Sequence, residues 1–332
     1  CTIDPSVGIV PVPDPRLAAL TELSKSAKTI PAVVEFVDIA GLVKGAADGA
    51  GLGNAFLAHI REVDAIVEVV RIFEDSDIIH VEAGMIDPVR DIDIVNLELV
   101  LSDLEAASTR LARVQRDAKR GEKEALAEAA ALEKAKNALE GGHLASTAGL
   151  TTEESALLGN LHLLTLKPMM YVLNKKAGGH NLDEMNDARF ARLTEYLGGM
   201  GATFVVVDAA IEGELRDVAG EDTQKLRQEF GVLDDGVDGL IRAGYDLLGL
   251  MTYFTTGPDE TRAWTIPKGS TAPEAGAAIH TDFKDKFIRA EVVYYDDLVA
   301  SGSFAKARER GLVRTEGKEY IVKDGDIVEF KI

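Results

Sequence analysis

The sequence predicts an α/β protein in which a doubly wound sheet is interrupted by a helical insertion and followed by a small α+β unit. Three observations support this prediction. Apolar, β-branched runs alternate with helical stretches over most of the chain, which is typical of a doubly wound sheet. One long helical run interrupts this alternation. After Gly249, short alternating strands with turn residues between them replace the earlier pattern.

The predicted sheet is built from apolar segments of strand length. They cover residues 7–12, 29–37, 64–72, 167–173 and 202–207. The second of these segments is almost continuously apolar, which is the pattern of a strand covered on both faces. Helices are expected at 54–62, after a glycine-rich loop, and at 186–197. In such a sheet the ligand site lies outside the carboxyl ends of the strands.

The helical run from about residue 92 to Gly141 predicts a coiled-coil hairpin. Apolar residues recur in steps of three and four between Leu97 and Val114, so they lie on one face of a helix. A polar gap at residues 119–122 separates this helix from a second one that ends at Gly141. Two helices joined by a short polar turn form an antiparallel hairpin.

A third helix is expected after the hairpin, because residues 151–154 match a capping box and open a helix that runs to about residue 163. The strands predicted on either side of the helical part belong to one sheet, so this part is an insertion. We therefore expect a first domain made of residues 1–91 and 163–247, an insertion at 92–162, and a C-terminal domain at 248–332.

The C-terminal domain is predicted from short strands and from a change in composition. The strands are expected at 252–255, 262–266, 287–295, 320–322 and 327–330. The turn Asp324-Gly325-Asp326 predicts a hairpin between the last two. Residues 262–332 hold 12 Lys or Arg against 12 Asp or Glu and contain 8 of the aromatic residues. This neutral, aromatic segment contrasts with the acidic remainder of the chain.

The overall charge restricts the class of partner. The chain has 36 Lys and Arg against 56 Asp and Glu, and its formal net charge is −20. A general positive field for nucleic acid is thus excluded, and we expect no sequence-specific DNA partner. A single cysteine excludes an intramolecular disulfide framework. No apolar run approaches the ~18 residues that span a bilayer, so we expect a cytoplasmic protein without a membrane partner.

Candidate functional residues follow a buried strand at Asp38-Ile39-Ala40-Gly41. In a phosphate-hydrolysing domain, an aspartate at this position holds Mg²⁺ and the glycine N–H binds a γ-phosphate. Further glycines beyond this string let the loop rearrange after hydrolysis. The same spacing also occurs at ordinary junctions between a strand and a turn. Thr2, before the first strand, is either a switch threonine for Mg²⁺ and γ-phosphate or a frayed terminal residue.

A base-reading position is expected at Asn174, directly after the strand at 167–173. A guanine-selecting loop has the pattern Asn-Lys-x-Asp, whose carboxylate accepts from the guanine N1–H and exocyclic amine. Asn174 and Lys175 match this pattern, whereas the fourth position is Ala177. Without the carboxylate, the two guanine donors would be unpaired, which costs affinity. The loop therefore favours adenine.

Several longer strings resemble the Obg-like ATPases of the YchF type. They are C-T-I-D-P at the start of the chain, V-P-D-P-R-L, F-V-D-I-A-G-L-V-K-G-A, G-x-G-L-G-N-x-F-L, I-I-H-V, G-P-D-E-x-R-A-W-T-I, I-H-T-D-F and Y-I-V-K-D-G-D. The resemblance implies a P-loop NTPase G domain with a doubly wound sheet, an inserted coiled-coil hairpin and a C-terminal TGS domain of β-grasp type. It also implies Mg²⁺-dependent hydrolysis of ATP in preference to GTP.

The resemblance further implies a cytosolic switch protein of translation or the stress response. Its partner would be the ribosome, as the large subunit or the whole particle, bound through the coiled coil and the TGS domain. Carried over residue by residue, it assigns metal binding to Asp38 and Thr2 and γ-phosphate binding to Gly41. Leu42 stands where many GTPases have a glutamine that orients water. The family's suspected substitute is a loop histidine, matched here by the catalytic candidate His80.

The chain departs from the family pattern at three places. Ala177 replaces the acid of Asn-x-x-Glu in the base loop. Asp208-Ala209-Ala210 stands where a small residue usually precedes alanine in the second nucleotide-binding loop, and Asp208 either accepts from an amine or faces solvent. In a full-length relative, the first strand and the G-x-x-x-x-G-K-S loop lie upstream of Cys1. We therefore expect the chain beginning at Cys1 to bind nucleotide poorly and to lack a central strand.

Two other functions stay open on the sequence alone. An Obg-type GTPase would bind GTP more tightly than ATP. A non-enzymatic ribosome adaptor would use the first domain only as a scaffold. Because the first domain is acidic, any contact with ribosomal RNA would go through local patches such as Lys119-Arg120 or Arg308, Arg310 and Arg314, which are otherwise ordinary solvated faces.

Overall fold

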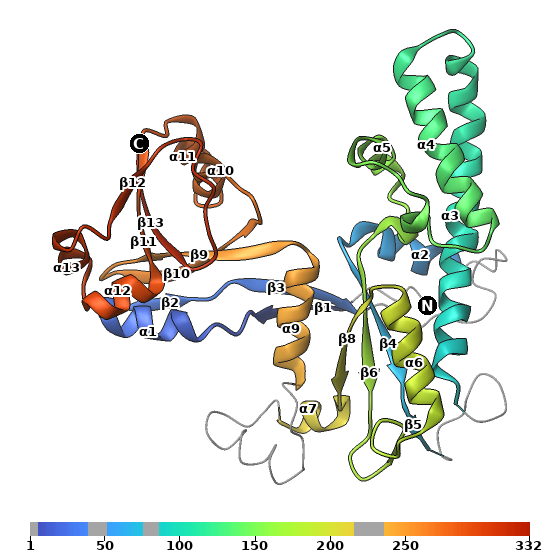
Figure 1. Cartoon of the computed structure of the whole chain (residues 1–332), viewed down its shortest axis with the longest axis horizontal. Helices are drawn as coiled ribbons and strands as arrows, with labels where there is room; N and C mark the ends of the chain where they lie inside the picture. The colour runs from blue at the N-terminus through green and yellow to red at the C-terminus, as the bar shows by residue number, and fades with distance from the viewer. Residues whose placement is uncertain (1–5, 39–51, 76–85, 216–235) are drawn as a thin grey trace. The chain divides into compact units, whose positions relative to one another are not determined.

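A computed structural model describes residues 6–38, 52–75, 86–215 and 236–332 (Figure 1). In the helix that begins at residue 52, side chains are described from Phe56 onward. The chain forms two compact units. The first unit contains residues 1–7 and 37–237, and the second unit contains residues 8–36 and 238–332. Residues 8–36 thus join the C-terminal unit, whereas the sequence boundaries placed them in the first domain.

The first unit contains a parallel sheet, as the alternating pattern predicts. Its strands are β4 (Ile66–Arg71), β6 (Met169–Asn174) and β8 (Thr203–Val207), in that order. The helices α3 (Pro88–Ala118) and α6 (Ala188–Gly199) pack against it, and the shared core contains the buried side chains Val70, Ile72, Val89, Ile92, Tyr171, Leu173, Leu193 and Leu197. The other elements here are α2 (Leu52–Glu62), α7 (Ala209–Leu215) and the short pair β5 (Phe73–Glu74) with β7 (His180–Asn181).

The expected single sheet is divided. β1 (Ser6–Pro11) pairs with β3 (Val33–Asp38) in a two-stranded sheet, separate from β4, β6 and β8. The strand expected at 29–37 is also broken, into β2 (Lys28–Ile30) and β3. Pro31 explains the break, because proline has no backbone N–H to donate to a sheet. β2 pairs with β10 (Glu260–Pro267), from Lys28 opposite Glu260 onward.

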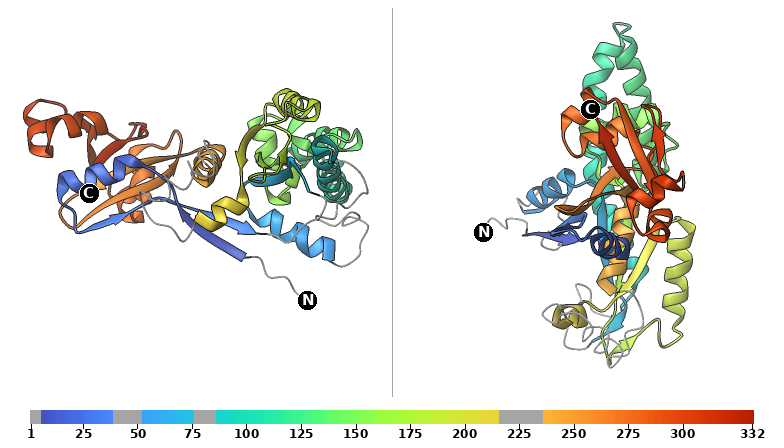
Figure 2. Two further views of the ribbon diagram at one scale, coloured as in Figure 1. Left: turned by 90° about the horizontal axis from the view of Figure 1, so that it is seen from below. Right: turned by 90° about the vertical axis from the view of Figure 1, so that its left-hand side faces the viewer.

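The helical insertion forms the predicted hairpin from α3 and α4 (Lys123–Glu140), which run side by side in Figures 1 and 2. α3 begins four residues before the expected start, because Asp87 accepts a hydrogen bond from the Arg90 N–H at 3.2 Å and Pro88 fits the first turn. Gly121, at φ +86°, forms the turn between the helices. The buried residues of the hairpin core include Ala107, Leu111, Val114, Leu132 and Leu139.

The capping box of the third helix is confirmed. The Thr151 hydroxyl accepts from the Glu154 N–H at 3.2 Å, and the Glu154 carboxylate accepts from the Thr151 N–H at 2.9 Å. This helix, α5 (Thr152–Leu157), is shorter than expected. The chain continues in 3-10 turns at Gly159–Leu161 and Leu164–Leu166, with His162 in the left-handed region between them, and a further 3-10 turn lies at Ala145–Thr147.

Asp103 of α3 ties the insertion to the chain that leads into β6. Its side chain is fully buried. One carboxylate oxygen accepts from the Leu164 N–H at 3.0 Å, and the other accepts from the N–H and the hydroxyl of Thr165, each at 2.8 Å. Arg61 of α2 contacts the same carboxylate at 3.3 Å. A buried charge with this many donors is stable, and it fixes three elements at one point.

The second unit has a six-stranded sheet in the order β12-β11-β13-β9-β10-β2. These strands include β9 (Leu250–Thr256), β11 (Arg289–Tyr294), β12 (Arg314–Glu316) and β13 (Asp326–Lys331). β13 is parallel to β9 and antiparallel to β11, which gives the predicted β-grasp arrangement. The helices are α1 (Pro15–Ser24), α9 (Gly236–Leu247), α10 (Ala272–Ala277), α11 (Thr281–Asp285), α12 (Tyr295–Ser301) and α13 (Phe304–Glu309).

The hairpin expected between 320–322 and 327–330 is wrong. Ile321 forms an isolated bridge with Thr271 instead of pairing with β13. Asp326 explains this, because its buried carboxylate accepts from the Lys323 N–H at 2.9 Å and the Tyr320 hydroxyl at 2.7 Å. These bonds hold the preceding segment in a turn rather than in a strand.

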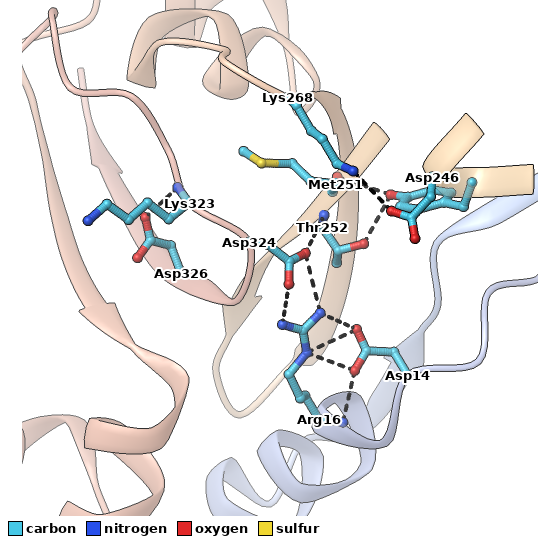
Figure 3. A network of polar contacts seen from close by, with 10 residues as sticks. Asp14, Arg16, Asp246, Met251, Thr252, Lys268, Lys323, Asp324 and Asp326 are labelled. Atoms are coloured by element: carbon cyan, nitrogen blue, oxygen red, sulfur yellow. Dashed lines mark hydrogen bonds and ion pairs between the residues drawn. The ribbon is translucent and has the colours of Figure 1, made fainter. Parts of the chain in front are cut away.

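An ion-pair network holds residues 8–36 to the sheet of the second unit (Figure 3). The Arg16 guanidinium, at the start of α1, binds Asp14 at 2.7 Å and Asp324 at 2.6 Å. Asp324 also accepts from the Thr252 N–H of β9 at 3.0 Å. The guanidinium stacks on Phe254, 5.1 Å from the ring centroid. One arginine thus links the start of α1 to β9 and to the turn that precedes β13.

In the part of the chain that the structure describes, no helix combines the length and the apolar character needed to cross a membrane.

Glu68 of β4 makes the stability of the first unit depend on pH. Its side chain is 9% exposed, and its Oε2 has no hydrogen-bond partner among the described residues. Burial, and to a lesser extent Asp91 and Asp93, raise its pKa from 4.5 to about 8. The folded state therefore binds a proton that the unfolded state releases. The free energy of unfolding should fall as pH rises from about 4.5 to about 8, by at most about 1.4 kcal/mol per pH unit.

Substitution Glu68→Gln should remove most of this pH dependence, because the amide carries no charge to bury. Urea unfolding at pH 5 and pH 8 measures the effect. Glu105→Gln, at an exposed position of α3, is the matched control and should unfold like the unaltered protein. An equal loss of stability between pH 5 and pH 8 in the unaltered protein and in Glu68→Gln would contradict the assignment.

Candidate functional site

The structure brings together four of the predicted site residues. Asn174 and Lys175 follow β6, and Asp208 and Ala209 follow β8. β6 and β8 are parallel neighbours, with Asn174 opposite Val207. Because the carboxyl ends of parallel strands lie at one edge of the sheet, the two loops meet there, where a doubly wound sheet has its ligand site.

The side chain of Asn174 is held in a defined orientation. Its Oδ1 accepts from the Ala209 N–H at 3.1 Å, and the side chain is half-buried. Since the nitrogen of a side-chain amide cannot accept a hydrogen bond, this bond also fixes which end of the amide is Nδ2. Nδ2 makes no hydrogen bond within the described part of the chain. The site therefore offers an oriented amide donor, which suits a ring-nitrogen acceptor such as purine N7.

Asp208 organises the loops around Asn174. Its side chain is 1% exposed, so the alternative that it faces solvent is wrong. One carboxylate oxygen accepts from the N–H groups of Ala210 and Ile211, each at 3.1 Å, and thereby caps α7. The other accepts from the Ala177 N–H in the loop after β6. The carboxylate thus joins the two loops through backbone donors.

The sequence analysis did not predict that Asp208 caps α7, although the sequence contains a signal for it. An aspartate directly after a strand and before a helix is a typical N-cap. The bond to Ala177 has no such signal, because it joins positions far apart in the chain.

The loop between β6 and β7 is also fixed by Asn181, which the sequence did not indicate. Asn181 is 1% exposed. It accepts from the Lys176 N–H at 2.9 Å and donates to the Lys176 carbonyl at 2.9 Å. Gly179 allows the tight turn, because a Cβ there would lie 2.9 Å from that same carbonyl. The loop therefore has one defined shape in this structure.

Lys175 and Ala177 lie in the same loop after β6, next to Asn174. The Lys175 side chain is 14% exposed, with Nζ 3.8 Å from Glu184. Ala177 is exposed and presents only a methyl group. Its backbone N–H is bound to Asp208, so position 177 offers a purine neither a carboxylate nor a free backbone donor. A guanine amine would find no side-chain acceptor at this position.

The predicted metal and phosphate residues lie mostly outside the described residues. This applies to Thr2, Gly41 and His80. Asp38 is described, and it lies exposed at the carboxyl end of β3. β3 pairs with β1, in a sheet separate from the one that carries Asn174.

The donor chemistry at Asp38 is compatible with Mg²⁺. Within the described ranges, no three His, Cys, Asp or Glu side chains form a metal-binding group. A single carboxylate fits Mg²⁺ nonetheless, because this ion is usually held by one or two carboxylates together with water and substrate phosphates.

Comparison with known proteins extends the resemblance over the whole chain. Residues 250–332 match the family model YchF-GTPase_C, described as "Protein of unknown function (DUF933)". The "Ribosome-binding ATPase YchF" of Bacillus subtilis is 50% identical over 331 residues, which are 100% of this chain and 90% of that protein. The protein of the same name from Haemophilus influenzae is 48% identical, with the same coverage.

A solved structure supports the same relationship. The "Structure of the Schizosaccharomyces pombe YchF GTPase" superposes with a TM-score of 0.86 and 36% sequence identity. The match covers 99% of this chain and 88% of that one. The resemblance drawn from the sequence motifs and the fold class that it implies are therefore confirmed.

The role of Asp208 is testable with Asp208→Asn. The amide oxygen still caps α7, but the amide nitrogen cannot accept from the Ala177 N–H. We expect a loss of about 1–3 kcal/mol in the free energy of unfolding, the cost of one unpaired buried donor. Hydrogen exchange at the Ala177 amide should become faster.

Asp246→Asn is the control for Asp208→Asn, because the exposed ion pair of Asp246 with Lys268 should contribute little. Unchanged exchange at Ala177 in Asp208→Asn would show that the carboxylate does not hold the loop.

Proposed function

This chain belongs to the YchF family, and on that premise we propose that it is a Mg²⁺-dependent nucleoside triphosphatase that prefers ATP and associates with the ribosome. The observation that supports this most is the 46–50% identity, over essentially the whole chain, to proteins named ribosome-binding ATPases. The geometry at the carboxyl ends of β6 and β8 is consistent with nucleotide binding.

The base would lie against the loops that follow β6 and β8. Asn174 would donate its free amide N–H to the purine, with Ala209 and Asp208 holding that amide and its loop in place. Lys175 would cover the base with its largely buried side chain. Ala177 supports a preference for ATP, because it supplies no acceptor for the guanine amine.

The phosphates and the metal would be held by residues carried over from the family motif. Asp38 and Thr2 would hold Mg²⁺, and Gly41 would donate its N–H to the γ-phosphate. When bound, Mg²⁺ neutralises charge that develops on the phosphates during hydrolysis. His80 would orient the attacking water or donate to the γ-phosphate, which is the task that Leu42 cannot perform.

Ribosome association would use the two parts of the chain that extend beyond the nucleotide-binding sheet. These are the coiled-coil hairpin of α3 and α4 and the C-terminal TGS domain, which begins near residue 248. Binding to the ribosome would place the protein in the cytoplasm and give nucleotide hydrolysis a role in translation or the stress response.

Asp38→Ala tests the enzymatic half of the proposal. In the protein expressed from its complete gene, this change should lower the rate of Mg²⁺-dependent ATP hydrolysis at least about 100-fold, because a metal-binding carboxylate is lost. Phosphate release measured over a range of Mg²⁺ concentrations gives the rate. Glu35→Ala, at an exposed position of the same strand, is the control and should keep normal turnover.

Unchanged turnover in Asp38→Ala would remove Asp38 from the metal site. If the unaltered protein released no phosphate but still sedimented with ribosomes, the adaptor function would replace the enzymatic one.

Ala177→Asp tests the base preference. A carboxylate at this exposed position could accept from the guanine N1–H and exocyclic amine, so GTP affinity should rise at least about tenfold relative to ATP affinity. Titration calorimetry with both nucleotides measures the ratio. Ala177→Asn has a similar shape without the charge and should shift the ratio less. If the unaltered protein already binds GTP more tightly than ATP, the proposed preference is wrong.

A further inference from the structure

The end of α3 carries a concentration of positive charge that is unusual for this chain. Residues 106–123 contain six Lys or Arg against two Asp or Glu, whereas the whole chain has a net charge of −20. The cations are Arg110, Arg113, Arg116, Lys119, Arg120 and Lys123. An acidic protein that binds a polyanion must do so through such a local surface.

Two of these arginines, Arg113 and Arg116, lie on the face of α3 that points away from α4, and a third, Arg120, lies in the turn that follows the helix. Leu111 and Val114 are buried in the hairpin core, and Ala118 packs against it. Arg113 and Arg116 follow Leu111 and Val114 by two positions each. Two positions correspond to about 200° around a helix, so the arginines lie nearly opposite the core. We call these three residues the α3 arginine face.

The α3 arginine face has guanidinium groups that are not used within the protein. Arg113 and Arg116 are exposed, and within the described residues neither forms an ion pair or a side-chain hydrogen bond. Arg110, one position from the core residue Leu111, differs because it binds Glu128 of α4 at 2.6 Å. Arg120 is only locally paired, with Asp117 at 3.1 Å. The outward arginines are thus available to a ligand.

A groove continues the α3 arginine face toward α2. Its volume is about 430 Å³. The lining includes the cations Arg61 of α2 and Arg113 of α3, together with Glu105 and the apolar side chains Leu57 and Leu161. Arg61 is held in place by a 2.8 Å bond from Nη2 to the Ser102 hydroxyl. Because Arg113 belongs both to the groove and to the outer face, the two are continuous at this residue.

We propose that this surface, from the groove beside α2 to the hairpin turn, binds the phosphate backbone of ribosomal RNA. The inference rests on the proposed association with the ribosome and specifies the chemistry of one contact. Planar guanidinium groups match phosphate oxygens with paired donors. The helix rise separates Arg113 and Arg116 by about 4.5 Å along the axis, so that their long side chains can contact neighbouring phosphates of one strand.

At the α3 arginine face, RNA is favoured over an acidic protein segment, because no large apolar side chain lies beside the arginines to anchor a polypeptide. The hydrophobic side chains of this part of α3 are directed into the hairpin core. Protein interfaces usually depend on buried apolar or aromatic anchors. A row of cations without a large exposed apolar side chain beside it fits a regular polyanion.

The double variant Arg113→Gln/Arg116→Gln tests the proposal in the protein expressed from its complete gene. The control is Lys134→Gln/Lys136→Gln, which removes the same charge from α4, where both lysines are paired with glutamates. Sedimentation with Bacillus subtilis 70S ribosomes and binding to protein-free 23S RNA are measured from 50 to 200 mM salt. Circular dichroism confirms that both variants keep their helix content.

The arginine variant should bind both probes at least about tenfold more weakly than the unaltered protein, and the control should stay within about twofold. The slope of log K against log salt should also fall by about 1.4 to 1.8, since each phosphate contact contributes roughly 0.7 to 0.9. Equal losses in both variants would overturn the inference, because net charge alone would then explain binding. A loss with an unchanged slope would overturn it in favour of a protein contact.

Failure of the inference and failure of the proposed function give different results. If the unaltered protein does not sediment with ribosomes, the proposed ribosome association is wrong. The RNA inference is then judged on 23S RNA alone, where equal binding by the two double variants overturns it. If the unaltered protein and the arginine variant sediment equally, the association holds and the α3 arginine face is not its contact.

Discussion

The buried carboxylate of Asp208 is the interaction on which the candidate site depends. It accepts from Ala177 in one loop and from Ala210 and Ile211 at the start of α7. Ala209, between these positions, donates in turn to the side chain of Asn174. The orientation of the Asn174 amide therefore depends on backbone groups that one acidic side chain holds in place. A neutral apolar residue at position 208 would leave those N–H groups unpaired, which is costly in a buried setting.

The same arrangement recurs at two other places. Asp103 joins the helical insertion to the start of β6, and Asp326 shapes the turn before β13. All three carboxylates are almost completely buried and accept backbone N–H groups. For Asp326, burial raises the pKa, so its hydrogen bonds only partly compensate the loss of water. Some of the acidic residues of this chain therefore have a structural role. Their carboxylates are buried and accept hydrogen bonds from loop backbones, so they do not contribute charge to the protein surface.

The sequence predicted local features well and long-range pairing less well. The parallel strands, the hairpin of α3 and α4, and the capping box at Thr151 follow from periodicity and neighbouring residues. The assignment of residues 8–36 to the second unit could not be predicted in this way, because it depends on long-range contacts. These are the pairing of β2 with β10 and the ion pair of Arg16 with Asp324. At the site, the positions of Asn174 and Asp208 were predictable from strand ends, whereas the bond from Ala177 to Asp208 joins residues 31 positions apart.

The long helix α3 connects the parallel sheet of β4, β6 and β8 to the arginine face. Its first turns carry Val89 and Ile92 in the core of the sheet, and its last turns carry Leu111 and Val114 in the core of the hairpin. The helix has 31 residues, with no glycine and with its one proline in the first turn. Kinks in helices usually need such residues inside the helix, so α3 should behave as a rigid rod of about 46 Å. Asp103 fixes this rod near its middle to the segment that leads into β6. A nucleotide-dependent change in the packing of Val89 or Ile92 would consequently move the arginine face as a unit, whereas a change confined to the loops of Asn174 and Asp208 would leave it where it is.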